Sequence, residues 1–344
     1  MKLDAGLGTE GDYLRGVDYT ARAAEDLGFA GLWTSETKHD AFLPLAIAAN
    51  ETREIDLGTS VAIAFSRSPM ETAQTAWDLQ NLSEGRFILG LGTQVKAHIT
   101  RRFSMTWDRP AARLREYILA LRAIWESFQS EKPLNFEGDF YRHTLMTPFF
   151  DPGPIDHPEI PIYIAGVNTR LANLAGEICD GFHVHPFHSP EYVRRTVIPA
   201  IAEGARQSNR DPERVTLATS AFVITGENEE RATEQRESVR TQISFYASTP
   251  TYLRVLEAHG WGEVGWRLGT MAREKKWREM PALINDEMLA AFAIEAAPDE
   301  IGPALRERYG GLIDRVALYL PFAPGERDEF WRTVVQAARA SGRT

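Results

Sequence analysis

Short apolar runs alternate with segments of helical periodicity along the whole chain. The apolar runs are typical of buried strands, and in the segments between them hydrophobic residues recur every three or four positions. We predict strands at residues 2–7, 31–34, 55–64, 87–91, 162–165, 181–185, 216–225 and 315–320. We predict helices at residues 13–27, 43–50, 68–82, 110–128, 170–178, from 189 onward, 229–245 and 326–340. Eight strands that are each followed by a helix favour an α/β fold, a (β/α)8 TIM barrel.

Local signals set several of these helix boundaries. Ser68, Pro69 and Glu71 combine a capping box with proline at the first helical position, so a helix should begin there. Gly28 follows the helical pattern of residues 13–27 and is a typical helix stop.

Two segments exceed a minimal barrel. Residues 129–161 contain an alternating stretch at 134–147, centred on Gly138, which predicts an inserted hairpin. Residues 246–309 are rich in Trp and charged residues and predict additional helices before the last strand. We therefore expect one domain over residues 1–344 with two insertions.

Composition narrows the function. The chain has 344 residues and a formal net charge of -10, which argues against a nucleic-acid partner. Cys179 is the only cysteine, so no disulfide forms within the chain, and a reducing compartment is favoured. No stretch approaches the roughly 20 apolar residues of a membrane span, and Asp4 interrupts any signal-peptide core. We expect a cytoplasmic protein with a small-molecule substrate and no membrane partner.

Polar residues after the predicted strands are the candidates for chemistry, because barrel active sites lie at the C-terminal ends of the strands. The loop after residues 31–34 carries Glu36, Thr37 and His39. His39 precedes Asp40, a carboxylate that could orient the imidazole for proton transfer. A helix-capping or surface role for His39 is an equally open alternative.

Two other loops have the features of anion sites. Gly166 ends a strand and precedes a predicted helix, whose N-terminus would present backbone N–H groups, and Arg170 adds charge. Gly92 is followed by Lys96, Arg101 and Arg102. A tight turn and solvated basic side chains are the simpler interpretation of each loop taken alone.

Two histidines share one face of the strand at 181–185. His183 and His185 are two positions apart, which is a conceivable metal pair. No metal-binding motif accompanies them, so we favour two barrel-lining histidines and expect no metal.

An ordered series of motifs resembles the bacterial luciferase-like monooxygenase superfamily. The series consists of Trp33-Thr34-Ser35-Glu36, Leu57-Gly58-Thr59-Ser60-Val61, Leu82-Ser83-Glu84-Gly85-Arg86-Phe87, Leu89-Gly90-Leu91-Gly92-Thr93, Phe136-Glu137-Gly138 and Ala175-Gly176-Glu177-Ile178-Cys179-Asp180-Gly181. The loops at 33–40 and 91–103 look most like the branch of coenzyme F420-dependent oxidoreductases.

This resemblance implies a deazaflavin or flavin lying across the C-terminal ends of the strands. It implies a bulge with a non-prolyl cis peptide behind the ring, at Ser60-Val61, and a cofactor tail held after the fourth and fifth strands. The implied cofactor-binding residues are Ser60, Val61, Thr93, Gln94, Val95, Lys96, Ala165, Gly166, Val167, Asn168 and Arg170. Many relatives have histidine directly after the acidic residue of the second loop, whereas this chain has Thr37, so Glu36, Thr37 and His39 all stay acid/base candidates.

The leading hypothesis is an F420-dependent oxidoreductase that transfers a hydride to or from an apolar organic substrate. An FMN-dependent monooxygenase of the same superfamily is the main alternative, a non-catalytic flavin-binding barrel the next, and a metal-dependent hydrolase a weaker one. His98, Trp107 and His185 are the candidate substrate residues. Aromatic residues that could wall an apolar pocket are Trp107, Phe149, Phe150, Trp261, Trp266 and Trp277. The family resemblance also implies a homodimer.

Overall fold

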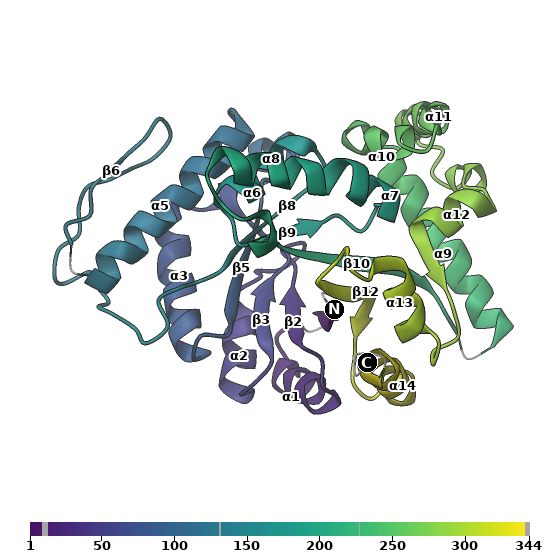
Figure 1. The fold of residues 1–344 in the computed structure, drawn as a ribbon, viewed down its shortest axis with the longest axis horizontal. Helices are drawn as coiled ribbons and strands as arrows, with labels where there is room; N and C mark the ends of the chain where they lie inside the picture. The colour runs from purple at the N-terminus through teal and green to yellow at the C-terminus, as the bar shows by residue number, and fades with distance from the viewer. Residues whose placement is uncertain (9–12, 131, 227, 341–344) are drawn as a thin grey trace.

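The computed structural model of the protein describes residues 1–8, 13–130, 132–226 and 228–340 (Figure 1). Its central feature is a closed parallel barrel. The barrel strands are β1 (Lys2–Leu7), β2 (Gly31–Thr34), β3 (Asp56–Thr59), β5 (Phe87–Gly92), β8 (Ile162–Gly166), β9 (Gly181–Val184), β10 (Thr216–Ile224) and β12 (Arg315–Phe322). They neighbour one another in the order β10-β12-β1-β2-β3-β5-β8-β9, and pairing of β9 with β10 closes the ring. The predicted (β/α)8 barrel is confirmed.

Helices surround this barrel and connect its strands (Figure 1). They are α1 (Val17–Leu27), α2 (Leu43–Glu51), α3 (Pro69–Leu82), α4 (Lys96–Arg101), α5 (Pro110–Ser130), α6 (Thr169–Ile178), α7 (Pro190–Tyr192), α8 (Ile198–Gln207), α9 (Glu229–Ala247), α10 (Leu253–Glu257), α11 (Gly262–Arg273), α12 (Asp286–Phe292), α13 (Ile301–Tyr309) and α14 (Asp328–Ala340). A π-helical turn, Val193–Val197, joins α7 to α8. No helix in the described ranges is long and apolar enough to cross a membrane.

The predicted boundary signals have the expected geometry. Ser68 caps α3, and its hydroxyl accepts a hydrogen bond from the backbone N–H of Glu71 at 3.1 Å. Gly28 ends α1 in the left-handed conformation, with φ of 88°, and its N–H returns to the carbonyl of Ala24. Helix α1 begins at Val17 rather than at residue 13, because Gly16 occupies the N-cap with φ of 76°.

The predicted strand at 55–64 is wrong as a continuous element. It divides into β3, a cis peptide between Ser60 and Val61, and β4 (Ala62–Ile63), and a short 3-10 turn follows. Gly58 pairs with Ile88 and Ala62 with Leu91, so the interrupted strand uses one more residue than β5 over this stretch. One extra residue is the definition of a β-bulge. The bulge and cis peptide implied by the family resemblance are therefore present.

Both segments that exceed the minimal barrel contain additional structure. Strands β6 (Phe136–Glu137) and β7 (Arg142–His143) form an antiparallel hairpin, which lies apart from the barrel beyond α5 (Figure 1). The later segment contains α10 to α13, and it also contains β11 (Ala293–Glu295), which pairs with β10. The segment thus contains additional helices, as expected, together with a strand that was not expected. The strand was missed because its three residues lie within an alanine-rich stretch of helical composition.

The barrel interior is packed rather than hollow. Trp33, Ile88, Tyr163 and Ala218 form a separate buried cluster inside it, distinct from the larger core between strands and helices. The cluster closes the middle of the barrel, so a ligand at the C-terminal end of the strands has a solid floor beneath it.

Candidate active site

A cavity of about 770 Å³ opens at the C-terminal ends of the barrel strands. The C-terminal ends of β2, β3, β5 and β8 and the loops after them contribute Thr37, Ser60, Val61, Gly92, Gln94 and Ala165. The opposite wall, from β9, β10, β12 and the helix α9, contributes His185, Phe222, Gln235, Gln242, Tyr246 and Tyr319. Because each set comes from neighbouring strands in the barrel order, the cavity has two distinct halves. Its size is that of a small-molecule or cofactor site.

Glu36 is held by a guanidinium at the edge of the cavity. Arg67 donates to both carboxylate oxygens of Glu36, at 2.7 and 2.9 Å, and a further nitrogen–oxygen contact of 3.2 Å joins it to Asp40. The backbone N–H of Ile63 donates to the same carboxylate at 2.6 Å. Both side chains of the ion pair are nearly enclosed, with exposed fractions of 8% for Glu36 and 13% for Arg67. Glu36 therefore anchors the bulged segment, and both of its carboxylate oxygens accept from these donors.

The other two acid/base candidates lie in different places. Thr37 lines the cavity, and its carbonyl accepts a hydrogen bond from Arg102 at 2.5 Å. His39 is exposed, and its ring stacks on Tyr13 with centroids 4.6 Å apart. Burial, together with the nearby charges of Asp40 and Glu36, raises the pKa of Tyr13 to about 12. The structure therefore brings Glu36 and Thr37 to the cavity and leaves His39 outside its lining.

Part of the expected cofactor set lines the first half of the cavity. Ser60, Val61, Gln94 and Ala165 all contribute to its wall. Gly92 allows the bulge to approach, because a Cβ at this position would lie 2.6 Å from a methyl group of Val61. The other residues expected after the fourth strand, Thr93, Val95 and Lys96, are not part of the lining. The side chains of Lys96 and Arg101 are exposed on α4, and that of Arg102 is exposed at its C-cap.

The remaining expected residues surround the beginning of α6. Asn168 caps this helix with its side-chain oxygen, which accepts from the N–H of Leu171 at 3.1 Å. The carbonyl of Val167 accepts from the hydroxyl of Tyr192 at 2.7 Å. Gly166 packs against Leu171, and Arg170 is exposed on the first turn. These residues are adjacent to Ala165 but do not line the cavity.

The two strand histidines both line the cavity. His183 packs edge-on against Trp33 at 5.0 Å, and His185 packs against Tyr246 at 4.7 Å. Burial lowers the pKa of each to about 3, so both imidazoles are neutral near pH 7. Within the described ranges, no group of three or more His, Cys, Asp or Glu side chains is arranged to hold a metal ion.

Comparison with known proteins places this geometry in a family. The model of the luciferase-like monooxygenase family matches residues 1–315. The chain belongs to this family.

Only some of the similar proteins have names that state an activity. An uncharacterized protein of Mycobacterium tuberculosis is 44% identical over 316 residues, which cover 92% of both chains. The 5,10-methylenetetrahydromethanopterin reductase of Methanolobus tindarius is 26% identical and covers 90% of this chain and 91% of the reductase. The solved structure of the coenzyme F420-dependent tetrahydromethanopterin reductase of Methanopyrus kandleri has a TM-score of 0.77 with 21% identity, covering 99% of both chains. This last likeness supports the fold alone.

The fold of this luciferase-like chain places the three candidate substrate-binding residues in different surroundings. His185 lines the cavity, whereas His98 is exposed on α4 and Trp107 packs edge-on against Phe65. Most of the aromatic residues expected to wall a pocket are exposed instead: Phe149, Phe150, Trp266 and Trp277. Trp261 stacks on His259, away from the cavity lining. The aromatic wall is built by Trp33, Phe222, Tyr246 and Tyr319.

Several residues that matter at this site of the luciferase-like barrel were missed from sequence. Arg67 was assigned no role, and the charged helix α9 was not connected with the site. A signal for α9 existed: Gln235, Ser238, Gln242 and Tyr246 recur at helical spacing and form an uncharged stripe within a charged helix. Arg67 had no comparable signal, because its partner Glu36 is distant in sequence.

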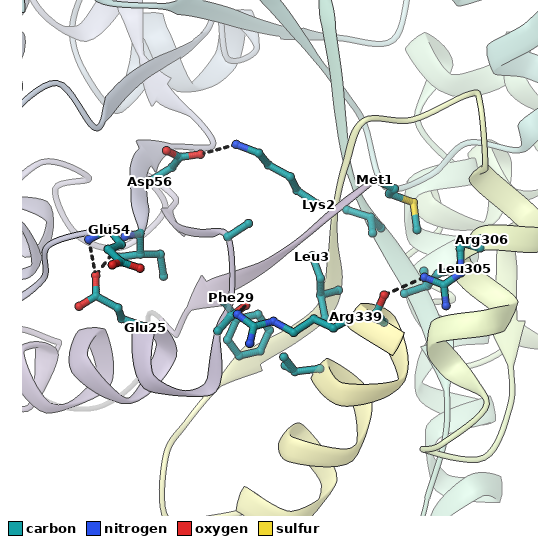
Figure 2. Close-up of a pocket in the computed structure, with 16 residues that line it drawn as sticks. Met1, Lys2, Leu3, Glu25, Phe29, Glu54, Asp56, Leu305, Arg306 and Arg339 are labelled. Atoms are coloured by element: carbon teal, nitrogen blue, oxygen red, sulfur yellow. Dashed lines mark hydrogen bonds and ion pairs between the residues drawn. The ribbon is translucent and has the colours of Figure 1, made fainter. Parts of the chain in front are cut away.

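A second cavity, of about 450 Å³, lies at the other end of this luciferase-like barrel, by the N-terminal ends of β1, β3 and β12 (Figure 2). Its polar groups are engaged in structural contacts. Lys2 pairs with Asp56 at 3.1 Å, and the Glu25 carboxylate accepts from the backbone N–H of Glu54 at 2.7 Å. The cavity at the C-terminal ends is therefore the better candidate for chemistry.

Proposed function

We propose that this protein is an oxidoreductase that binds coenzyme F420 and transfers a hydride between the deazaflavin and a small organic substrate. The observation that carries the proposal is the first half of the large cavity. There the bulge at Ser60-Val61 faces Gly92, Gln94 and Ala165 across one concave wall. The name of the Methanopyrus kandleri reductase, which shares this fold, includes coenzyme F420, so the fold is compatible with that cofactor.

The residues present fit such a cofactor. Gly92 has no side chain and packs closely against Val61, so at this point of the wall a flat ring could approach the backbone. Lys96 and Arg101 are exposed on α4, Arg102 is exposed at the C-cap of this helix, and Arg170 lies at the start of α6. These cations would attract the anionic tail of the cofactor to one side of the cavity.

The chain would bind and orient while the cofactor carries out the redox chemistry. F420, when bound, would supply or accept the hydride. Glu36, fixed by Arg67, would hold the bulged segment in place through the N–H of Ile63. The Thr37 hydroxyl can donate to or accept from a ring heteroatom, and neutral His185 can do the same toward substrate. We therefore propose Glu36 as a positioning residue and leave proton transfer to other groups.

Titration with F420 and with FMN, followed by fluorescence, tests the assignment. We expect micromolar or tighter binding of F420 by the wild-type protein. The triple variant K96A/R101A/R102A should weaken F420 binding by about 3- to 100-fold, since three exposed ion pairs at roughly 0.2–1 kcal/mol each sum to about 0.6–3 kcal/mol. FMN has fewer negative charges, so its affinity should fall less.

The matched control removes three exposed cations elsewhere, in K132A/R142A/R206A. This control should leave both affinities within about twofold of wild type, because screening limits the effect of distant charges. Absence of F420 binding at micromolar concentration, or equal losses for both cofactors, would contradict the assignment. Tighter binding of FMN than of F420 would instead favour an FMN-dependent enzyme, and the description of the family names a monooxygenase.

A further inference from the structure

We propose that the second half of the cavity, bounded by α9, β10 and β12, binds an uncharged carbonyl group of the substrate through the hydroxyls of Tyr246 and Tyr319. This inference deepens the proposed function, on which it rests, by naming a substrate class and the residues that select it. It is carried by the geometry of the two hydroxyls, by the uncharged stripe on α9 and by the pairing of the nearby carboxylates.

The two tyrosine hydroxyls form a mutual hydrogen bond within the cavity. Their oxygens are 2.7 Å apart, and both residues belong to its lining. Two hydroxyls carry two protons, and one proton suffices for the bond between them. The second proton is available to a ligand, so the pair offers one hydrogen-bond donor to the cavity. Burial raises the pKa of Tyr246 above its usual value, which keeps this donor protonated near neutral pH.

Packing fixes where these hydroxyls point. The ring of Tyr319 lies edge-on to Phe222 at 4.9 Å, and the ring of Tyr246 lies edge-on to His185 at 4.7 Å. Tyr246 also contacts Tyr252 at 5.9 Å. Aromatic neighbours on several sides restrict the rings, so the donor is preorganised and a ligand does not have to order it.

The helix α9 adds uncharged polar groups to the same wall. Gln235, Ser238 and Gln242 lie on successive turns and line the cavity beside Tyr246. Amide and hydroxyl groups can follow the polar outline of a neutral ligand without requiring a counter-charge. A wall that offers one hydrogen-bond donor among uncharged polar side chains suits a carbonyl compound as ligand.

Charged ligands are poorly matched by the lining. Among the lining residues that the structure describes, the carboxylates are Asp4 and Glu36, and each is already paired, with Arg315 and Arg67 respectively. An ammonium group entering this half would find these carboxylates already paired, and a carboxylate group would find no Lys or Arg among the described lining residues. Burying an unpaired charge is costly, so the reacting end of the substrate should be neutral.

Binding of three matched probes tests this inference without requiring turnover. Acetophenone has a carbonyl acceptor, ethylbenzene has a similar shape without one, and benzoate carries a charge. We would titrate each by saturation-transfer NMR against the full-length protein, with and without added F420. Acetophenone should bind more tightly than benzoate. In Y246F/Y319F, the acetophenone dissociation constant should rise by about 3- to 10-fold, as expected for one lost hydrogen bond, while that of ethylbenzene should change by less than about twofold.

The double variant decides the test, because removing one hydroxyl frees the other to donate. The single variants Y246F and Y319F identify the hydroxyl that faces the ligand, and Y19F, at an exposed position on α1, is the control for tyrosine substitution. No acetophenone binding to the wild-type protein, or equal losses for acetophenone and ethylbenzene, would overturn the inference. If the wild-type protein does not bind F420 but the tyrosine variants still weaken acetophenone more than ethylbenzene, the proposed cofactor is contradicted and this subsite is supported.

Discussion

The ion pair between Arg67 and Glu36 fixes the loops at the mouth of the barrel, and no pattern in the sequence predicted it. Arg67 donates two hydrogen bonds to the Glu36 carboxylate, which also accepts one from the backbone N–H of Ile63. Arg67 also lies over the ring of Phe42 at 5.2 Å. The pair therefore connects the loop after β2 with the bulged strand that lines the proposed cofactor site.

Removing one member of this pair should destabilise the protein. We expect R67M to lower the free energy of unfolding by about 3 kcal/mol, the low end for a broken buried pair because Arg67 keeps some exposure. The double variant E36Q/R67M should be less destabilised than R67M, since the amide oxygen that replaces the carboxylate would still accept from Ile63 and carries no charge. Urea unfolding of the three proteins measures the difference. A double variant as unstable as R67M would show that the charge left on Glu36 is not the cause.

At the scale of elements, β9 and the turn after it bring together three histidines, of which His183 and His188 are buried and His185 lines the cavity. Burial lowers the pKa of His183 and His185 to about 3 and that of His188 to about 4. Their pKa in the unfolded chain is close to 6.5. Between roughly pH 6.5 and 4 the unfolded chain therefore binds more protons than the folded protein, and its stability falls as the pH falls.

These three histidines predict that the free energy of unfolding decreases at acidic pH. Above about pH 6.5 the three histidines should contribute no pH dependence, and below it each should remove up to about 1.4 kcal/mol of stability per pH unit. Unfolding free energies measured at pH 7, 6 and 5 give the slope. H185Q should reduce that slope by up to about 1.4 kcal/mol per pH unit, which corresponds to one proton. H157Q, at an exposed position, is the control and should leave the slope unchanged. An unchanged slope in H185Q would contradict the buried, neutral state of His185.

The elements also show what a single sequence can and cannot predict. Short apolar runs located the eight barrel strands, and Ser68 and Gly28 marked helix ends because capping is a local interaction. The bulge after β3 left no mark in the periodicity, since the apolar run at 55–64 continues through it, and it was expected only from the family resemblance. Likewise, the family motifs indicated the first half of the cavity. The second half depends on α9 meeting β12, a long-range contact that no local pattern encodes.

For the whole molecule, a buried network joins the last strand to the first. Arg315 on β12 donates to both carboxylate oxygens of Asp4 on β1, each at 2.9 Å, and to Asp56 on β3 at 2.6 Å. Trp33 on β2 donates to Asp4 at 2.8 Å. Gly31 permits this close approach, because a Cβ there would lie 2.4 Å from the guanidinium. Four neighbouring strands are thus tied together where the chain closes the barrel.

Closure of the barrel should therefore depend strongly on Arg315. We expect R315M to cost about 3–5 kcal/mol, because it leaves Asp4 charged and enclosed without its cation. K2M removes an exposed partner of Asp56 and should cost no more than about 1 kcal/mol, which makes it the matched control. D4N/R315M should recover part of the loss, since the amide still accepts from Trp33 without a buried charge. Guanidinium unfolding followed by circular dichroism measures all three variants. Equal stabilities of R315M and K2M would mean that packing between β1 and β12, and not this network, holds the barrel closed.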